Sequence, residues 1–364
     1  MTPHALTPLD GIDTPALLVD VDVMEANMAR IIARCRQAGV GWRPHCKSHK
    51  SPDIARLQIA AGAIGITCAK LSEAEAMAEA GITDILIANQ IAGPLKIARL
   101  MALRQQVDVA VAVDGPDNVA ALAAAVQTAG MRLRVLIEVD TGTRRAGVLP
   151  GAPVVELARI IASHPGLELA GVMTWEGHTT RIRDPAEKRA AIAQAVGDLV
   201  RSADLCRAAG FPIAIVSCGG TGTFETSAGI PGVTEIQAGG GIFGDVRYRT
   251  IYNVPLDYGL TVLSTVTSRP TPQRVICDAG KKAMSTDAGM PFPLDLPPVA
   301  SVGFSAEHGK IELQGPSEEP RVGDRIRVVV GYADTTVHLH DEIHALRAGQ
   351  IAHIWRIPRA ARLR

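Results

Sequence analysis

Residues 108–140 read DVAVAVDGPDNVAALAAAVQTAGMRLRVLIEVD, with a short apolar segment at each end and a longer alanine-rich segment between them. The end segments are nearly continuous runs of aliphatic residues, which is typical of strands in a parallel sheet that is buried on both faces. Apolar residues in the middle segment follow the period of about 3.6 residues that marks a helix. The stretch therefore predicts a strand, a helix and a second, parallel strand.

The same alternation extends along the chain in both directions. A lead-in strand at 17–22 and a helix that ends near residue 38 come first, and eight strand candidates follow, each ending at a polar or glycine-rich turn. Helices are expected between them, such as one over 72–80 with Ser72 as its N-cap. Eight strand–helix repeats predict an α/β fold built on a (β/α)8 barrel. The eight candidates are 40–47, 63–70, 84–89, 108–114, 132–140, 167–177, 213–220 and 234–239.

From about Pro255 the pattern changes, because strand candidates follow one another without a helix between them. The segment RAGQ, residues 347–350, is expected to form the turn of a hairpin. We therefore expect two domains: residues 1–254, the barrel with its lead-in strand, and residues 255–364, an all-β domain. The strands expected in the second domain are 260–268, 274–280, 310–315, 325–332, 336–341 and 351–357.

The composition excludes several classes of protein. Thirty-seven basic and 37 acidic residues give a formal net charge of zero, so no excess positive charge is available for a nucleic-acid partner. No apolar run approaches the roughly 18 residues of a membrane-spanning helix. The first residues, MTPHALTPLDGIDTP, have neither the basic start nor the apolar segment of a signal peptide, and we expect a cytoplasmic protein. Six cysteines are scattered without a C-x-x-C pair, which predicts neither a disulfide framework nor a zinc site.

Unusual residues gather where the predicted barrel strands end. Enzymes with this fold carry their catalytic groups at the carboxyl ends of the strands, often with a phosphate site after the seventh and eighth. The first strand ends in RPHCKSHK (43–50), which contains three cations and two histidines that we expect at this rim. The other strand ends with candidate residues are DTGTRR (140–145), WEGH (175–178), GGTGT (219–223) and GGG (239–241).

The GGTGT segment can present several backbone N–H groups and two hydroxyls to an anion, because glycine allows close approach and unusual dihedral angles. An ordinary turn is the alternative, but the position after the seventh strand favours a phosphate site. Lys47 stands at the end of a buried strand, where desolvation favours the uncharged, nucleophilic amine. A lysine that merely reaches solvent is the alternative. Together, the lysine and the glycines predict pyridoxal 5'-phosphate held as a Schiff base.

Six strings, in order from about Asp13 to Ile351, carry a resemblance to a known family. They are RPHCKSHK (43–50), EVDTGTRRAGV (138–148), GGTGTFE (219–225), TEIQAG (234–239), CDAGKKAMS (277–285) and AEHG (306–309). With these strings the chain resembles the D-threonine aldolase and D-serine dehydratase group, pyridoxal phosphate enzymes of the alanine-racemase-like fold. The resemblance implies a barrel followed by a β-domain.

The resemblance also implies roles for single residues. Lys47 would carry the cofactor, with Lys50 as the competing lysine. Arg145, rather than Arg144, would lie against the pyridine nitrogen. His178 would be the general base on the substrate's β-hydroxyl group, and a histidine hydrogen-bonded structurally at the rim is the alternative. The expected cofactor-binding residues also include Gly220, Thr221, Gly222, Thr223, Gly239 and Gly240.

A departure from the family pattern lies near the C-terminus. Relatives carry a His-x-Asp or His-x-Cys pair that binds a divalent metal ion, and here the pair is Tyr332 and Asp334. A neutral phenol is a poor ligand for an ion such as Mg²⁺ or Mn²⁺, whereas the Asp334 carboxylate remains suitable, so metal binding is in doubt. Tyr332 would either fill the metal position or hydrogen-bond the substrate's hydroxyl. His338, His340 and His344 are expected on one face of a strand, as half-exposed residues or as a zinc site.

These features predict a pyridoxal phosphate lyase that cleaves D-3-hydroxy-α-amino acids to glycine and an aldehyde. Dehydration of D-serine or a related substrate to a keto acid and ammonia is the alternative within the family. An amino-acid racemase comes third, because no second base opposite Lys47 is identified. A non-catalytic pyridoxal phosphate carrier is the alternative from another class, and a β-domain of about 110 residues argues against it. The resemblance implies a homodimer that takes a small D-amino acid.

Overall fold

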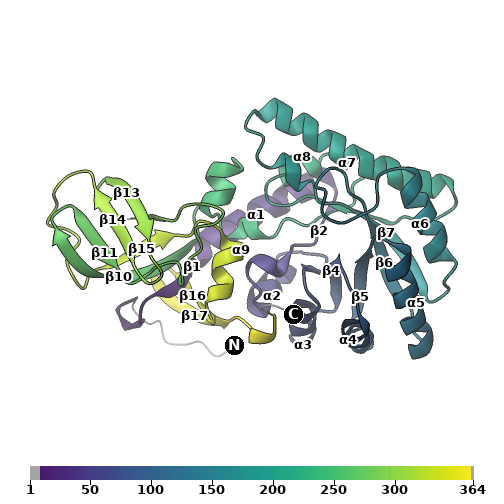
Figure 1. Ribbon diagram of the computed structural model, residues 1–364, viewed down its shortest axis with the longest axis horizontal. Helices are drawn as coiled ribbons and strands as arrows, with labels where there is room; N and C mark the ends of the chain where they lie inside the picture. Colours follow the sequence, from purple (N-terminus) through teal and green to yellow (C-terminus); the bar gives the residue numbers. More distant parts are fainter. Residues whose placement is uncertain (1–8, 295, 362–364) are drawn as a thin grey trace. The chain divides into compact units, whose positions relative to one another are not determined.

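The computed structural model describes residues 9–294 and 296–361 (Figure 1). These residues form two compact units. The barrel unit contains Ala29–Lys47 and Ile54–Gly239, and the strand-rich unit contains the described chain up to Met28, Ser48–Asp53 and Gly240–Arg359. The chain thus enters each unit more than once. The domain limits at residues 254 and 255 remain a prediction.

The barrel unit is built on parallel strands at the positions that the sequence predicts. These are β2 (Gly41–Trp42), β3 (Ile66–Cys68), β4 (Asp84–Gln90), β5 (Asp108–Val113), β6 (Leu133–Glu138), β7 (Leu167–Met173), β8 (Ile215–Cys218) and β9 (Glu235–Ile236). Within the fully described stretch 29–239 they hydrogen-bond in the order β2-β9-β8-β7-β6-β5-β4-β3. A β-bridge between His45 and Thr67 joins the two ends of this order, so the sheet closes on itself. The predicted (β/α)8 barrel is confirmed.

Helices alternate with these strands. They are α2 (Pro52–Ala60), α3 (Leu71–Glu79), α4 (Pro94–Arg104), α5 (Pro116–Ala129), α6 (Ala152–Ala162), α7 (Pro185–Ala208) and α8 (Phe224–Ser227). Proline stands at the first or second position of α4, α5, α6 and α7, where its fixed φ and missing N–H suit a helix start. None of the described helices combines the length and apolar character needed to cross a membrane.

The start of α3 differs from the prediction. Ser72 is not the N-cap, because the helix begins at Leu71 and Lys70 precedes it as the cap. The Glu73 carboxylate accepts hydrogen bonds from the N–H groups of Ala69 at 2.6 Å and Lys70 at 3.2 Å. A glutamate at the third helical position satisfies N–H groups that have no partner inside the helix. The carboxylate, rather than a serine hydroxyl, therefore sets this helix start.

A network of ion pairs fills the amino-terminal end of the barrel. Arg43, directly after β2, is buried and pairs with Glu235 of β9 at 3.1 Å and with Asp84 of β4 at 2.9 Å. Arg134 of β6 pairs with the same Asp84 at 3.2 Å and with Asp108 of β5 at 2.8 Å. The sequence predicts Arg43 at the catalytic rim, and this is wrong. Asp84 and Glu235 are the first residues of their strands. They therefore neutralise the charge of Arg43 at the amino-terminal end of the barrel, opposite the predicted catalytic rim.

The described part of the strand-rich unit contains one nine-stranded sheet. Its strands are β1 (Ala16–Asp20), β10 (Leu260–Thr271), β11 (Arg274–Cys277), β12 (Phe292–Pro293), β13 (Val299–Phe304), β14 (Gly309–Leu313), β15 (Arg325–Val329), β16 (Glu342–Arg347) and β17 (Gln350–Arg356). Their order is β13-β14-β11-β10-β1-β16-β17, and β15 pairs with β10 and β12. The lead-in strand β1 is antiparallel to β10 and parallel to β16. It is followed directly by α1 (Val21–Ala38).

The segment 336–341 is not a strand, contrary to the prediction. A short helix, α9 (Ala333–Thr336), and a 3-10 turn, η6 (Val337–Leu339), stand there instead. The buried carboxylate of Asp245 accepts a hydrogen bond from the N–H of Ala333 at 2.7 Å. The first N–H groups of a helix need such an outside acceptor. The sequence does not predict strands β12 and β13. β12 has only two residues and β13 lacks a buried apolar run, so neither gives a strand pattern.

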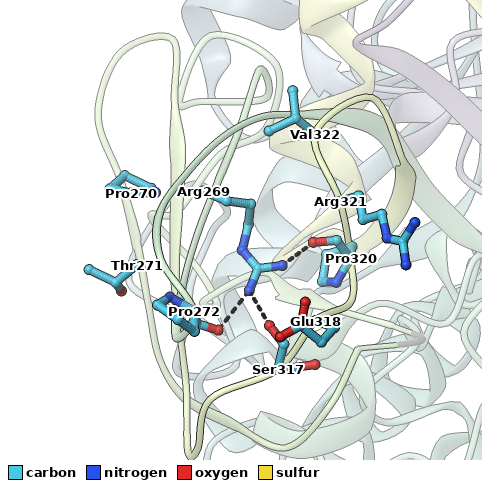
Figure 2. Close-up of a pocket in the computed structure, with 9 residues that line it drawn as sticks. All are labelled: Arg269, Pro270, Thr271, Pro272, Ser317, Glu318, Pro320, Arg321 and Val322. Carbon is cyan, nitrogen blue, oxygen red and sulfur yellow. Dashed lines mark hydrogen bonds between the residues drawn. The ribbon is translucent and has the colours of Figure 1, made fainter.

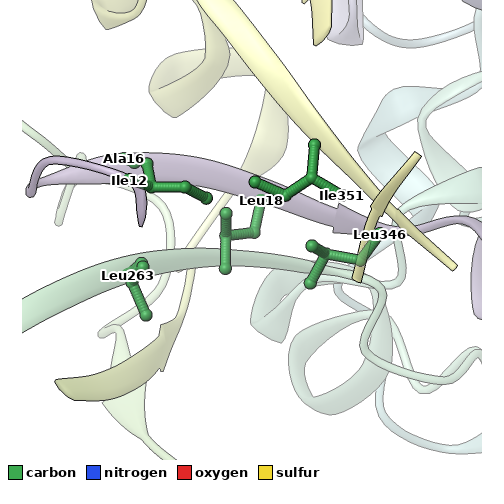
Figure 3. Packing of buried hydrophobic residues seen from close by; sticks show 6 residues of the cluster. All are labelled: Ile12, Ala16, Leu18, Leu263, Leu346 and Ile351. Carbon is green, nitrogen blue, oxygen red and sulfur yellow. The ribbon is translucent and has the colours of Figure 1, made fainter. Parts of the chain in front are cut away.

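The hairpin of β16 and β17 turns where the sequence predicts. Ala348 and Gly349 have positive φ angles of 50° and 76°, as a tight two-residue turn requires. Leu346 and Ile351 flank the turn and belong to a buried cluster with side chains of β1 and β10 (Figure 3). Burial contributes about 1.5–3 kcal/mol per large aliphatic side chain, so this cluster stabilises the β1–β16 pairing. Its members are Ile12, Ala16, Leu18, Leu263, Leu346 and Ile351.

Arg43→Met should destabilise the fold strongly. The change leaves the buried Glu235 carboxylate without its cation, and breaking a buried ion pair typically costs about 3–5 kcal/mol. Urea unfolding at neutral pH should show a loss of this size. The double variant Arg43→Met/Glu235→Gln should recover much of it, since no uncompensated buried charge remains at Glu235. A single variant as stable as the wild type would show that this network does not stabilise the barrel end.

Candidate active site

Lys47 lies just beyond the β-bridge of His45, which follows the first barrel strand. It belongs to a 3-10 turn, η2 (Cys46–Ser48), that follows the bridge between His45 and Thr67. Its N–H donates to His45 Nδ1 at 3.4 Å, and its side chain is half-buried. Lys50, the competing lysine, is buried in the strand-rich unit and has a positive φ of 50°. Of the two lysines, Lys47 is therefore the one at the carboxyl end of β2.

Two thiols and a carboxylate form a buried group next to Lys47 in the chain. Cys46 Sγ is 3.5 Å from Cys68 Sγ and 3.8 Å from Glu73 Oε2. Among the described residues, these three donors are close enough to hold a metal ion. However, the same Glu73 oxygen already accepts the N–H groups at the start of α3, and the Cys46 thiol is placed to donate to it. The group is therefore a hydrogen-bonded part of the barrel core.

A buried carboxylate organises the glycine loop that follows β8. Glu176, shortly after β7, accepts hydrogen bonds from the hydroxyls of Thr223 at 2.7 Å and Ser227 at 2.6 Å. It also accepts from the N–H of Gly219 at 3.3 Å. The Thr223 hydroxyl in turn accepts from the Gly220 N–H at 3.0 Å. The sequence places Glu176 in the candidate segment WEGH (175–178) but does not predict this role, because the donors that it binds come from a later loop.

Close packing requires glycine at two positions of the predicted phosphate site. A Cβ atom at Gly220 would lie 2.2 Å from the indole of Trp175, and one at Gly239 would lie 2.1 Å from the carbonyl oxygen of His45. Gly222 is buried, and its N–H donates to no other residue in the described chain. Buried N–H groups are almost always paired, so this group fits an acceptor such as a phosphate oxygen. The loop therefore has the features of an anion cradle.

The other predicted phosphate ligands fall into two places. Thr221 is buried in the same loop, and Thr223 donates its hydroxyl proton to Glu176. Gly240 belongs to the strand-rich unit, where it begins the 3-10 turn η4 (Gly240–Ile242). The structure thus places residues 220–223 in one loop. The Thr223 hydroxyl bonds to Glu176 and so helps to hold this loop in place.

The loop after β6 carries Arg145. Its guanidinium pairs with the buried Glu138 at 3.2 Å, and Glu138 also accepts from Gln90 Nε2 at 2.6 Å. Arg144 is exposed with a positive φ of 55°, and its N–H donates to Asp140 Oδ1 at 2.9 Å. Of the two arginines, Arg145 is the one whose guanidinium is held by a buried carboxylate.

His178 lies in the 3-10 turn η3 (Gly177–Thr179), beside the loop that follows β6. Its ring is exposed, and Nδ1 is 3.5 Å from Thr143 Oγ1. A Cβ atom at Gly142 would lie 2.8 Å from His178 Nε2, and Gly142 has a φ of 132°, so glycine is required there. The Thr143 hydroxyl donates to the carbonyl oxygen of Trp175. The loops after β6 and β7 thus meet at an imidazole that a ligand can reach.

Tyr332 and Asp334 lie in the strand-rich unit at the start of α9. The half-buried Tyr332 ring packs edge-to-face on Tyr248, with centroids 5.8 Å apart, and the Arg247 guanidinium carbon lies 4.6 Å from the Tyr332 centroid. The Tyr332 hydroxyl hydrogen-bonds to Asp334 and Tyr248. Asp245, which accepts hydrogen bonds from the N–H groups of Ala333 and Tyr248, is buried, and burial raises its pKa to about 8. The expected metal position is therefore part of an aromatic and charged cluster.

The three histidines near the C-terminus have different surroundings. His338 belongs to η6, His340 follows it with Nε2 at 2.7 Å from Ala283 O, and His344 lies in β16. The predicted row on one face of a strand is wrong, because α9 and η6 replace that strand. Burial lowers the pKa of His344, and Glu342 at 3.4 Å opposes this shift. Within the described chain, no group of three metal-binding donors includes these histidines.

A pocket in the strand-rich unit contains none of the predicted site residues (Figure 2). The guanidinium of Arg269 lies at its centre and donates to the carbonyl oxygens of Pro320, of Pro272 at 2.6 Å and of Ser317 at 2.9 Å. Backbone acceptors therefore already surround this charge. The contact braces two loops of the sheet, and the barrel rim remains the candidate active site.

Two family models match the chain. The model described as alanine racemase, N-terminal domain, matches residues 19–247, more than half of the chain. The chain belongs to this family. A second model, described as a putative serine dehydratase domain, matches residues 259–346. Together they confirm the resemblance drawn from the sequence, and the alanine-racemase-like family implies pyridoxal phosphate as the cofactor.

Members of the family are similar to this chain over nearly its whole length. D-threonine aldolase from Arthrobacter sp. is 36% identical over 353 residues, which cover 96% of this chain and 93% of that protein. The crystal structure of D-threonine aldolase from Filomicrobium marinum has a TM-score of 0.94 at 35% identity, covering 99% of this chain and 98% of that one. D-threo-3-hydroxyaspartate dehydratase from Delftia sp. HT23 has a TM-score of 0.86 at 31% identity, covering 97% and 99%. These relatives are lyases.

Thr223→Val tests whether Glu176 holds the glycine loop. Valine keeps the shape of threonine but removes the hydroxyl group that bonds to Glu176 and Gly220. Unsatisfied buried polar groups typically cost about 1–3 kcal/mol, so we expect a lower unfolding temperature and faster amide exchange at Gly220. Thr226→Val is the matched control, because Thr226 lies in the same segment and, in the part of the chain that the structure describes, is not among the donors to Glu176. Equal stability of the two variants would contradict this role.

Proposed function

We propose that this chain is a pyridoxal phosphate-dependent lyase that cleaves D-3-hydroxy-α-amino acids between Cα and Cβ, giving glycine and an aldehyde. The observation that carries the proposal is the similarity to D-threonine aldolase, 36% identity over 96% of the chain. The barrel supports it, because its carboxyl-terminal end presents a lysine, an arginine, a histidine and a glycine loop. Barrel enzymes carry out their chemistry at this end.

The barrel rim fits pyridoxal phosphate. Lys47 would hold the cofactor through its amine, the loop 219–223 and Gly239 would hold the phosphate, and Arg145 would face the ring nitrogen. The buried N–H of Gly222 supports the phosphate assignment, because it needs an acceptor. When bound, the cofactor withdraws electrons from the substrate's Cα and so stabilises the carbanion that bond cleavage leaves.

Arg145 would limit the reactions that the site favours. A guanidinium stays protonated in proteins, and Glu138 holds this one at 3.2 Å. Arg145 would therefore be unable to protonate a ring nitrogen that it faced, which would keep electron withdrawal moderate. Retro-aldol cleavage needs only a moderately stabilised carbanion, so this arrangement suits the proposed reaction.

His178 would accept the proton of the substrate's β-hydroxyl group, directly or through a water molecule. Imidazole accepts protons near neutral pH, and the exposed ring beside Gly142 is open to a ligand. Loss of this proton allows the hydroxyl oxygen to become the aldehyde oxygen as the Cα–Cβ bond breaks. The Thr143 hydroxyl at 3.5 Å would orient the ring.

Dehydration is the second candidate, since the Delftia dehydratase matches at a TM-score of 0.86. In that reaction the hydroxyl group leaves as water, and the products are a keto acid and ammonia. The products therefore separate the two candidates without any assumption about the site.

Purified protein loaded with pyridoxal phosphate should release acetaldehyde from D-threonine and benzaldehyde from D-phenylserine, with glycine in equal amount. Aldehyde is measured by a coupled alcohol dehydrogenase assay, and L-threonine is the control substrate. Keto acid and ammonia from D-serine or D-threo-3-hydroxyaspartate would support the dehydratase instead. If no D-amino acid gives a product while the bound cofactor keeps its absorbance, both candidates fail.

Lys47→Ala should abolish the visible absorbance band of lysine-bound pyridoxal phosphate, because the amine that forms the linkage is gone. Lys50→Ala is the matched control and should keep the band. Persistence of the band in the Lys47→Ala variant would move the linkage to another lysine.

The homodimer and the cytoplasmic location remain predictions from the resemblance and the N-terminal sequence. Light scattering of the purified protein would measure the number of subunits.

A further inference from the structure

We propose that a hydrogen-bonded cluster of Tyr248, Tyr332 and Asp334 replaces the divalent cation that the family resemblance implies, so that the chain binds no such ion at this position. The resemblance places a histidine ligand where Tyr332 stands. The inference goes beyond the proposed function, because it concerns which ligands the residues at the expected metal position can bind. Its test gives a result whether or not an amino acid is turned over.

The Tyr332 hydroxyl group is engaged on both sides. It donates a hydrogen bond to the Asp334 carboxylate and accepts one from the Tyr248 hydroxyl. Tyr248 Oη also lies 3.5 Å from Asp334 Oδ1. The phenol proton is therefore held between Tyr332 and the Asp334 carboxylate. A phenol that keeps its proton does not offer the anionic oxygen that a hard divalent cation prefers.

A fixed positive charge lies against the same ring. The Arg247 guanidinium carbon is 4.6 Å from the Tyr332 ring centroid and 5.1 Å from that of Tyr252. Its Nε donates to Tyr252 Oη at 2.7 Å, which holds the guanidinium in place. The electrons of an aromatic face attract such a cation. A divalent ion at the Tyr332 hydroxyl would meet this like charge, so Arg247 opposes metal binding.

The surrounding backbone holds the cluster in place. The Asp245 carboxylate accepts hydrogen bonds from the N–H groups of Ala333 at 2.7 Å and Tyr248 at 2.9 Å. The N–H of Arg247 donates to the carbonyl oxygen of Gly331 at 3.0 Å. These bonds hold the Tyr248 segment against the Tyr332 segment. The two phenols are therefore positioned by the fold, without help from a metal ion.

Asp334 is the carboxylate of the expected metal-binding pair, and its partner in that pair is a phenol. Divalent cations in proteins are held by several oxygen or imidazole ligands. In residues 9–294 and 296–361, no set of three His, Cys, Asp or Glu donors within reach of one another includes Asp334. The residues present therefore fit hydrogen bonding and do not fit a divalent ion.

A manganese titration tests the proposal directly. Free Mn²⁺ is measured by electron paramagnetic resonance as it is added to the pyridoxal phosphate-loaded wild type, to Tyr332→His and to Tyr332→His/Asp334→Asn. We expect the wild type to leave Mn²⁺ free. Tyr332→His should bind about one ion per chain, because it creates a His-x-Asp pair, and the double variant should lose it. Tyr258→Phe is the matched control and should also leave Mn²⁺ free, because Tyr258 lies outside the cluster and packs on Phe292.

Binding of about one Mn²⁺ per chain by the wild type, abolished by Asp334→Asn, would overturn the proposal. A folded Tyr332→His variant that binds no Mn²⁺ would overturn it as well, because Tyr332 would then not be what excludes the ion. If Tyr332→His does not fold, the titrations of the wild type and of Asp334→Asn still decide. None of these measurements depends on turnover, so failure of the proposed aldolase activity leaves them valid.

If the chain is an aldolase, its activity provides a second readout. Aldehyde release by the wild type should be unchanged by EDTA and by added Mn²⁺. Loss of activity on chelation, restored by Mn²⁺, would contradict the proposal.

Discussion

The catalytic end of the barrel depends on one buried carboxylate. Glu176 stands between Trp175 and the turn that carries His178, and it gathers hydroxyl and N–H donors from the loop after β8. A buried carboxylate is strongly unfavourable unless it is hydrogen-bonded, so the loop must close around it when the barrel forms. One charge thereby positions both the histidine and the glycine loop. It also explains how a loop rich in glycine, the residue with the greatest backbone freedom, adopts a defined conformation.

Local sequence patterns are sufficient for the barrel strands, because each is an apolar run that ends at a turn. Local patterns are insufficient where a side chain bonds to a residue that lies far away along the chain. Arg43 bonds to Asp84 and Glu235, which follow it by 41 and 192 positions, so its place at the amino-terminal end could not be predicted from its neighbour Lys47. The donors to Glu176 follow it by 43 to 51 positions. The bonds of Arg43 and those of Glu176 therefore could not be predicted without the folded structure.

The C-terminal segment shows how one distant acceptor changes local structure. Residues 336–341 alternate as a strand would, but Asp245, 88 positions before Ala333, offers an acceptor that allows a short helix to start. The sequence does single out Tyr332, because the pattern of relatives predicts a histidine there. It cannot show that three of the four tyrosines, Tyr248, Tyr252 and Tyr332, pack into one cluster. That grouping arises from tertiary packing, which no local pattern encodes.

The position of β1 has a consequence for synthesis of the chain. Leu18 of β1 pairs with His344 of β16, so a strand that is synthesised before the barrel waits for a strand that is synthesised after it. The stretch Ile54–Gly239 is continuous within the barrel unit and can fold as it emerges, whereas the strand-rich sheet cannot be completed until β16 is made. Until then β1 has an unpaired edge, and such edges promote aggregation. A deletion that removes β16 would therefore leave β1 without one of its two partner strands.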